Sequence, residues 1–267
     1  MPDQAPRPPG EHLDRVREQF RRQAEAYSRM AVVRSERLLE AIARASGAGP
    51  ADRVLDLASG PGYLTMALAE RAREVLGIDA TDRFVEQATA EAAGRGLGNV
   101  EFRVGDVERL DLPGDSFDVV TCKFAFHHFP RPRAVLAEMV RVARAGGTLV
   151  IADMLADEDP AKRAYQDRIE RLCDPSHAGA IPASEYEAMF AGLDLGITAR
   201  HERETTYGVE EWLRHGGPSA EDARRIVELL EASLDEDRCE LRVRREDGEL
   251  RFSHRGITWV LRNGADL

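Results

Sequence analysis

The stretch Val54-Leu55-Asp56-Leu57-Ala58-Ser59-Gly60-Pro61-Gly62 decides the fold of this chain. Its apolar residues lead into a turn of small residues, a pattern typical of a buried strand that opens into a ligand-binding loop. A second apolar run, 75–78, ends at Asp79, and the segment 63–73 between the two runs has apolar residues at helical spacing. The sequence therefore predicts a β-α-β unit with an acid at the end of each strand.

This unit favours a nucleoside ligand. Gly60 and Gly62 let the backbone turn sharply and a ligand approach closely, and an acid after the second strand can accept both hydroxyls of a ribose. A dinucleotide fingerprint needs a third glycine at residue 65, where the chain has Thr65. A nucleoside without a pyrophosphate is therefore favoured, although an ordinary tight turn with no ligand would contain the same glycines.

The same alternation continues along the chain. A third strand is predicted over 100–107, a fourth over 116–124 and a fifth over 148–153. A helix over 133–144, which we expect two glycines to stop, precedes the fifth strand. Alternating strands and helices predict an α/β fold with a parallel, doubly wound sheet and right-handed crossovers.

With these elements the chain resembles the class I S-adenosylmethionine-dependent methyltransferases, in particular the ubiquinone and menaquinone biosynthesis group with a type 11 methyltransferase domain. The motifs are specific for fold and cofactor but not for the substrate. They lie within residues 50–155 and are 54–62, Gly77-Ile78-Asp79, Gly105-Asp106-Val107, Phe117-Asp118-Val119-Val120, His127-His128-Phe129-Pro130 and 141–147. The resemblance implies a Rossmann-like sheet of seven strands, mostly parallel with an antiparallel last strand beside the sixth, plus helical lid insertions.

The resemblance also implies which residues hold S-adenosylmethionine, whose product is S-adenosylhomocysteine. The methionine and ribose part would lie near Asp56, Ala58, Gly60 and Gly62, and the ribose diol near Asp79 and Ala80. Ala58 stands where the family often has glycine, so we expect a slightly tighter approach there.

The remaining cofactor contacts follow from the same resemblance. Asp106 would accept from the adenine amino group, and the backbone N–H of Val107 would donate to the ring. Lys123 would offer its backbone carbonyl near the methionyl end, its side chain taking no part. Asp106 could alternatively cap the end of its strand.

Four side chains are candidates for catalysis. Tyr27 lies in a segment that folds over the cofactor in the resembling family, although an aromatic residue on an apolar helix stripe also packs. His127 and His128 follow the fourth strand, and histidine is suited to proton transfer near neutral pH. One of this pair could instead cap the next helix. His177, in the motif Asp174-Pro175-Ser176-His177, could face the pocket or belong to a turn held by its neighbours.

We expect five segments. Residues 1–10 form a disordered leader, 11–49 an N-terminal helical lid with helices over 12–30 and 31–45, and 50–155 the cofactor-binding core. Residues 156–195 provide a lid helix, a pocket loop and a crossover helix. Residues 196–267 hold the last two strands and a helical cap insertion, 207–248, and the apolar phase of the last strand predicts a bulge near Gly256.

The composition of the chain limits the classes of binding partner that we expect. The net charge of −11 argues against a nucleic-acid substrate, and three scattered cysteines predict neither disulfides nor a zinc site. No stretch reaches the length of a membrane span, and no signal peptide is evident. We expect a cytoplasmic protein with a small-molecule substrate and no bound metal, and the sequence leaves a homodimer open.

Three functions remain. The first is methyl transfer by in-line displacement, without metal, to a carbon, oxygen or nitrogen atom of a small molecule. The second is an NAD-dependent oxidoreductase on a Rossmann scaffold, which Thr65 disfavours. The third is a protein that binds S-adenosylmethionine without catalysis, because a fold alone does not prove function.

Overall fold

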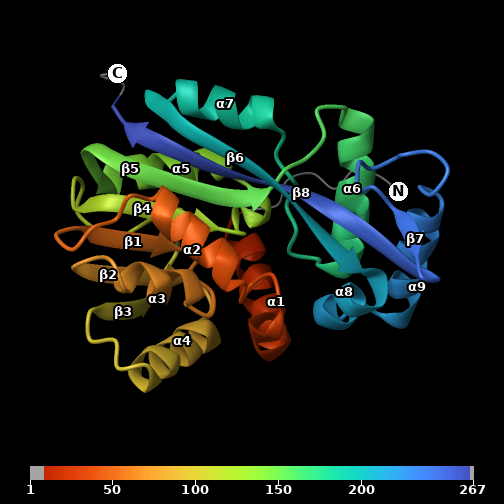
Figure 1. Cartoon of the computed structure of the whole chain (residues 1–267), viewed down its shortest axis with the longest axis horizontal. Coiled ribbons are helices and arrows are strands. Elements are labelled where there is room, and N and C mark those ends of the chain that lie inside the picture. The colour runs from red at the N-terminus through yellow and green to blue at the C-terminus, as the bar shows by residue number, and fades with distance from the viewer. Residues whose placement is uncertain (1–8, 265–267) are drawn as a thin grey trace.

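The computed structural model describes residues 9–264 and is organised around one mixed sheet (Figure 1). The strands are β1 (Arg53–Leu57), β2 (Glu74–Asp79), β3 (Val100–Val104), β4 (Phe117–Lys123), β5 (Ala143–Met154), β6 (Leu195–Gly208), β7 (Arg244–Glu246) and β8 (Glu249–Asn263). Their order is β3-β2-β1-β4-β5-β8-β6, and the short β7 pairs with β8 alone. The strands β1 to β5 are parallel, whereas β8 runs antiparallel to β5 and β6. The predicted Rossmann-like fold is confirmed.

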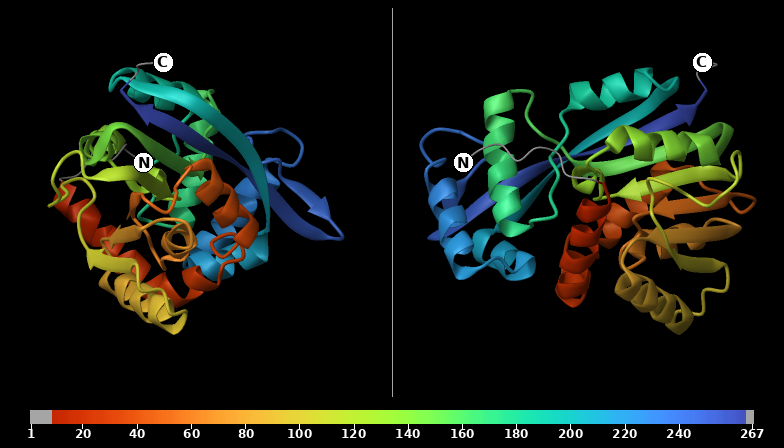
Figure 2. Two further views of the ribbon diagram at one scale, coloured as in Figure 1. Left: turned by 60° about the vertical axis from the view of Figure 1, so that its left-hand side comes forward. Right: turned by 180° about the vertical axis from the view of Figure 1, so that it is seen from behind.

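Helices cover both faces of this sheet (Figure 2). They are α1 (Pro9–Arg29), α2 (Glu36–Ala45), α3 (Tyr63–Ala69), α4 (Asp82–Gly94), α5 (Pro132–Val142), α6 (Pro160–Cys173), α7 (Ala183–Ala191), α8 (Val209–Gly216), α9 (Ala220–Glu231) and the 3₁₀ turn η1 (Phe126–His128). The helices α2 and α3 pack on one face, and α5 and α7 on the other. Within residues 9–264 no helix is both long and apolar enough to cross a membrane.

The first strand reads as a continuous apolar run because both of its faces are buried. Val54 packs with α2 and α3, while Leu55 and Leu57 belong to the opposite cluster under α5 and α7. The small residues after β1 then turn the chain into α3, whose first residue is Tyr63. The open end of β1 therefore lies beside the ends of β2 and β4, its two neighbours in the sheet.

Two details of the predicted strands were wrong. The helix α5 ends at Val142 and β5 begins at the next residue, so the two glycines that follow lie in the strand and do not stop the helix. β8 pairs with β6 through Gly256 without a shift, and its pairing with β5 ends at Gly256. The register shift lies instead in β6, between Ile197 and Ala199. The apolar phase of β8 changes because the strand leaves the cap, where Phe252 is buried, and enters the central layers.

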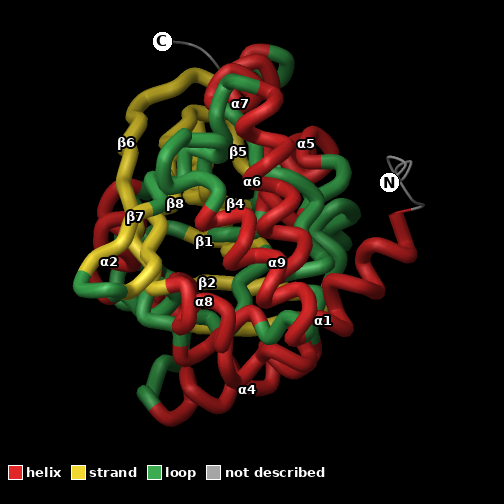
Figure 3. The backbone as a smooth tube through the Cα atoms, turned by 90° about the vertical axis from the view of Figure 1, so that its right-hand side faces the viewer, coloured by secondary structure: helices red, strands yellow, loops and turns green. Residues whose placement is uncertain are grey.

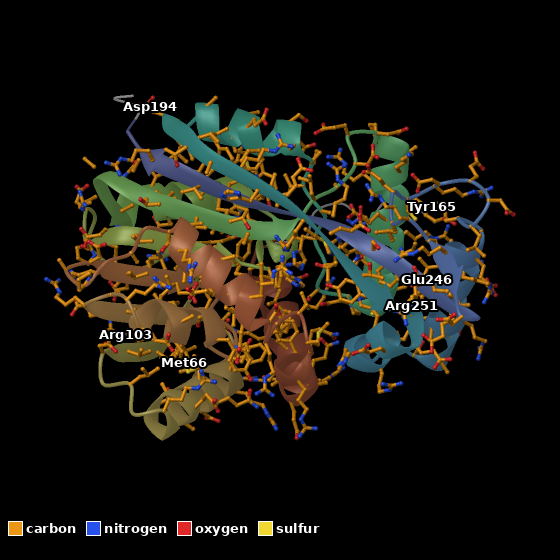
Figure 4. The ribbon with its side chains drawn as sticks, in the orientation of Figure 1. Met66, Arg103, Tyr165, Asp194, Glu246 and Arg251 are labelled. Carbon is orange, nitrogen blue, oxygen red and sulfur yellow. The ribbon has the colours of Figure 1, made fainter. Side chains whose placement is uncertain are left out.

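The two insertions predicted as separate lid and cap segments form one cap with its own apolar core. Ile169 of α6, Trp212 of α8, Ile226 of α9 and Phe252 of β8 belong to the same buried cluster, and Figure 3 shows these helices together on one side of the molecule. The hydroxyl of Tyr165, labelled in Figure 4, donates to the carbonyl of Leu229 at 2.9 Å and ties α6 to α9.

The helix α1 connects the sheet domain to this cap. Arg21 forms a two-pronged ion pair with Asp82 of α4, at 2.9 and 2.7 Å, and the amide of Gln23 donates to the carbonyl of Gly216 in α8. The helix α2 instead packs on the sheet. Of the predicted lid, 11–49, only α1 has a lid's position, and the predicted leader, 1–10, lies outside the described residues except at its last two positions.

Candidate functional site

Two cavities lie under α1, at the carboxyl ends of the parallel strands, where ligands bind in open α/β sheets. Each has a volume of about 140 Å³, so their linings and not their sizes distinguish them. We name the first the core cavity; it is lined by, among others, Ala58, Gly60, Asp79, Ala80, Asp106 and Val107. We name the second the cap cavity; it is lined by, among others, His127, Asp153, Glu170, Arg203, Tyr207 and Trp212. Phe20, Tyr27, Phe124 and His128 line both.

Asp79 is the acid at the centre of the core cavity. One carboxylate oxygen accepts the backbone N–H of Gly60 at 2.7 Å, and the other accepts that of Thr81 at 2.8 Å. Burial raises the pKa of Asp79, and these hydrogen bonds oppose that shift. Because a carboxylate offers about four acceptor positions, both oxygens can accept further hydrogen bonds, as a ribose diol requires.

Asp106 and Val107 lie further along the same cavity. One oxygen of Asp106 accepts the backbone N–H of Glu108 at 2.9 Å, which is the capping role that the sequence left open. Its other oxygen and the backbone N–H of Val107 have no hydrogen-bond partner within residues 9–264. An acceptor and a donor are thus available side by side, and their contact with adenine stays a prediction.

Asp56 does not line either cavity. It lies buried beneath the turn and accepts hydrogen bonds from the hydroxyls of Thr65 and Thr121, both at 2.7 Å. Burial raises the pKa of Asp56 to about 6. Thr65 therefore occupies the position of a third glycine with a hydroxyl that holds Asp56, and Asp56 supports the loop from behind.

Gly62 and Lys123 also lie away from both linings. A side chain at Gly62 would place its Cβ 2.6 Å from the ring of Phe102, so this glycine permits packing below the turn and not the approach of a ligand. The ammonium of Lys123 lies 4.3 Å from the ring centre of Phe124, and burial lowers the pKa of Lys123 to about 8. Phe124, one residue later, is the one that borders both cavities.

The loops of the core cavity contain backbone strain. Ala58 has a φ of 51° and Phe124 a φ of 56°, in the left-handed region that costs an L-residue roughly 1–2 kcal/mol. The alanine expected only to tighten the approach therefore has a conformational cost as well. Such strain persists where the surrounding structure imposes it, and it concentrates at functional sites.

His127 and Asp153 form a hydrogen-bonded pair in the cap cavity. Nδ1 of His127 lies 2.6 Å from Oδ1 of Asp153, whose Oδ2 accepts the backbone N–H of His127 at 3.0 Å. Burial alone would lower the pKa of His127, but the charge and hydrogen bond of Asp153 raise it above its usual value. With Nδ1 engaged, Nε2 is left without a partner among residues 9–264 and can accept a proton, the arrangement of a general base oriented by a carboxylate.

His128 belongs to the wall between the cavities. Its Nδ1 lies 3.2 Å from the carbonyl and hydroxyl oxygens of Ser176, and its own carbonyl lies 2.8 Å from Nε2 of His12 in α1. Burial, followed by the nearby charge of His127, lowers the pKa of His128. A neutral His128 therefore supports the wall and the contact with α1.

Of the motif 174–177, Asp174 lines the cap cavity as predicted, whereas His177 does not. His177 is buried and lines neither cavity, and its Nε2 lies 2.8 Å from Oδ1 of Asp167. The turn is held by Asp174, whose carboxylate accepts both the N–H and the hydroxyl of Ser176. The ring of His177 lies 5.6 Å from that of His127, so it supports the pair from behind.

Tyr27 faces both cavities from α1. Its ring lies edge-on to Phe20 at 5.5 Å, and burial raises the pKa of its hydroxyl well above the usual range. Tyr27 is therefore neutral at physiological pH. Its side chain lines both cavities, and its role in transfer stays a prediction.

Known proteins with similar sequences and folds identify the family. A family model described as a methyltransferase domain matches residues 49–201. The uncharacterized methyltransferase YcgJ of Bacillus subtilis is 35% identical over 186 residues, 70% of this chain and 74% of that protein. Its crystal structure superposes with a TM-score of 0.81 at 30% identity and covers 85% of this chain and 97% of that one. The chain belongs to the class I S-adenosylmethionine-dependent methyltransferase family.

More distant proteins match parts of the sequence or the fold of this methyltransferase. A demethylmenaquinone methyltransferase of Clavibacter sepedonicus is 32% identical over 178 residues, 66% of this chain and 69% of that protein. A geranyl diphosphate methyltransferase solved in complex with S-adenosylmethionine has a TM-score of 0.62 at 16% identity, over 85% of this chain and 84% of that one. At that identity the likeness shows the fold alone.

Several polar residues of this methyltransferase's cap cavity were not found by sequence reasoning. Asp153 had a signal, because it is an acid at the end of a parallel strand, like Asp79. Arg203 of β6 had none, and neither did the buried pair of Glu170 and His254, whose atoms Oε1 and Nε2 lie 2.7 Å apart. These side chains meet only because the cap folds against β6 and β8, far away in sequence. Within residues 9–264 no group of three or more His, Cys, Asp or Glu side chains is placed to hold a metal ion.

Proposed function

We propose that this methyltransferase binds S-adenosylmethionine in the core cavity and methylates a small molecule held in the cap cavity. The observation that carries the proposal is the shared wall, since Phe20, Tyr27, Phe124 and His128 border both cavities. Two cavities that share these lining residues are adjacent, so a donor in one can be aligned with an acceptor in the other, and such alignment can supply several kcal/mol of the barrier.

The residues of the core cavity fit this cofactor. Asp79 keeps acceptor positions for a diol, and Asp106 with Val107 offers an acceptor beside a donor, as the edge of adenine requires. When bound, S-adenosylmethionine supplies a methyl group on a sulfonium that is already electrophilic. The protein's contribution is therefore binding, alignment, exclusion of water and, where needed, removal of a proton.

His127 is the residue that we assign to proton removal. Its Nε2 accepts the proton of the acceptor atom, whether oxygen, nitrogen or carbon, while Asp153 holds the ring and stabilises the cation that forms. The helix α1 excludes water from both cavities, because its contacts with α4 and α8 hold it across them. Tyr27 and His128 complete the wall.

Calorimetric titration with S-adenosylmethionine, S-adenosylhomocysteine and NAD tests the cofactor. We expect both sulfur ligands to bind and NAD not to bind. Tight binding of NAD without a response to either sulfur ligand would replace this proposal with the oxidoreductase. Cofactor binding without S-adenosylhomocysteine formation, across acceptors with O–H, N–H and activated C–H groups, would leave a binding protein.

A pair of variants tests the base in the same turnover assay. His127→Ala is expected to lower the rate about 100-fold or more, the usual contribution of a general base. His177→Ala, which alters a residue behind the cavity, is expected to have a smaller effect and to leave cofactor affinity unchanged. Equal losses in the two variants would remove His127 from its assigned role.

A further inference from the structure

The cap cavity contains a guanidinium that the protein holds in place but does not neutralise. Arg203 lines this cavity from β6, and its Cζ lies 5.1 Å from the ring centre of Phe124. A Cβ at Gly256 of β8 would come within 2.6 Å of Cζ. Glycine at 256 thus makes room for the guanidinium, which lies close to both the ring of Phe124 and the backbone of β8.

Arg203 has no carboxylate partner. Among the described residues, no Asp or Glu oxygen lies within 4.0 Å of its nitrogens, and the single hydrogen bond is from Nη1 to the carbonyl of Ile257 at 3.3 Å. Nε is buried without a partner. By contrast, Arg200 on the same strand pairs with two glutamates, and Arg255 on β8 pairs with two as well. A buried donor left without a hydrogen-bond partner destabilises the folded protein, and more strongly where the group is charged.

The acids that line the cap cavity are already engaged elsewhere. Asp153 is paired with His127 at 2.6 Å, and Glu170 with His254 at 2.7 Å. Asp174 accepts from the backbone and hydroxyl of its own turn. None of these carboxylates lies within 4.0 Å of the nitrogens of Arg203. The charge of Asp153 acts on Arg203 from a greater distance, so the guanidinium keeps free donors for an anionic ligand.

The aromatic side chains that line the cavity indicate the chemistry of the uncharged part of that ligand. Phe20, Tyr27, Phe124, Tyr207 and Trp212 all line it, and aromatic side chains of this kind favour flat aromatic partners. A guanidinium binds a carboxylate with two parallel hydrogen bonds, which a neutral group of similar shape does not match. Arg203 lines the same cavity, and its Nε and Nη2 have no hydrogen-bond partner within residues 9–264.

We propose that Arg203 anchors the acceptor through a carboxylate, so that the substrates of this methyltransferase are aromatic carboxylic acids. This assignment rests on the proposed function and names the substrate class of the same site. Arg203 is a positioning and specificity residue. It orients the aromatic ring of the substrate relative to the residues that line both cavities, and His127 accepts the proton.

Calorimetric titration of the full chain with 2-naphthoate and with 2-naphthamide tests the assignment, both with and without S-adenosylhomocysteine. The two probes share a ring and differ in charge. We expect the wild-type protein to bind naphthoate at least tenfold more tightly than naphthamide, and Arg203→Gln to remove that preference. Arg203→Lys should keep part of it, because lysine retains the charge but not the two-pronged geometry.

Arg200→Gln is the matched control, since Arg200 lies on the same strand but pairs with surface glutamates; it should keep the preference. Equal binding of the two probes to the wild type, no binding of naphthoate, or an intact preference in Arg203→Gln would overturn the assignment. A failure of S-adenosylhomocysteine to bind would overturn the proposed function instead, and the comparison of the two probes on the unloaded protein would still decide the role of Arg203.

Discussion

Asp153 Oδ1 and His127 Nδ1 lie 2.6 Å apart because of the register of two parallel strands. The last residue of β4, Lys123, pairs with Ala152 of β5, so Asp153 lies just beyond the end of its neighbour. The turn η1 then brings His127 back over that end. The position of the pair is therefore set by the central sheet, and the cap contributes the other residues that line the cavity.

The first prediction concerns the pKa of His127, which NMR of its ring can follow without an acceptor. In the wild type it should lie above the ordinary value, because Asp153 outweighs burial. In Asp153→Asn it should fall below that value, since burial then dominates. Asp167→Asn, which alters the partner of His177, is the control and should move the pKa of His127 much less. An unchanged value in Asp153→Asn would mean that the pair does not control this titration.

The same shift sets the pH dependence of turnover. A base works in its neutral form, so the rate should rise as the pH passes upward through the raised pKa of His127. In Asp153→Asn the rising limb should move to lower pH while the plateau falls, because the ring loses its orientation. If the rising limb of the pH–rate profile stayed at the same pH in Asp153→Asn, the titrating group would be one other than His127.

The second prediction concerns Asp79, the acid that we propose to hold the ribose. Asp79→Ala should weaken S-adenosylhomocysteine binding by about 1.5–3 kcal/mol, the usual loss when hydrogen bonds to a charged group are removed. The measurement is a calorimetric titration, and Glu91→Ala is the control because Glu91 is a surface acid of α4 that pairs with Arg95 in the same helix and does not line the core cavity. Equal affinities in wild type and Asp79→Ala would show that the sugar binds elsewhere.

The sheet and the core cavity were accessible from the sequence because their signals are local. The small-residue turn before Gly62 and the acid at Asp79 each follow a strand within a few residues, so periodicity places them together. The cap cavity was not accessible in this way. Arg203 and Gly256 meet through antiparallel pairing of β6 with β8, a contact between segments far apart in the chain. His177 was placed by topology on the correct side of the sheet, but the direction of its side chain depends on Asp167.

The third prediction separates the two glycines of the turn. At Gly60 a Cβ would meet only Tyr27, at 3.9 Å, whereas at Gly62 it would lie 2.6 Å from Phe102. Both have positive φ values, 53° and 78°, so alanine costs about 1–2 kcal/mol of stability at either position, and overpacking at Gly62 adds about 1–3 kcal/mol. Urea unfolding should show the larger loss of stability for Gly62→Ala. Gly60 lines the core cavity, so Gly60→Ala should show the larger loss of cofactor affinity when the folded variants are compared. The reverse order would exchange the roles assigned here.

The fourth prediction concerns the cap as a unit of its own. Phe252 is fully buried at its centre, in contact with the rings of Tyr207 and Trp212. Phe252→Ala removes a large aromatic side chain from a packed core and should destabilise the cap by about 3–5 kcal/mol. Amide hydrogen exchange should then speed up in α6, α8 and α9 together, with β1 and α3 much less affected, because the sheet packs in separate clusters.

Phe117→Ala is the matched control, since Phe117 is a buried phenylalanine of the central sheet. It should speed exchange throughout β1, β4 and β5. If Phe252→Ala instead accelerated exchange evenly over the whole chain, the cap and the sheet would unfold as one cooperative unit. If it affected α9 alone, the two insertions would not share a core. Because α1 is tied to the cap through Gln23 and Gly216, loosening of the cap should also weaken the closure of α1 over both cavities, which a faster release of S-adenosylhomocysteine from Phe252→Ala would register.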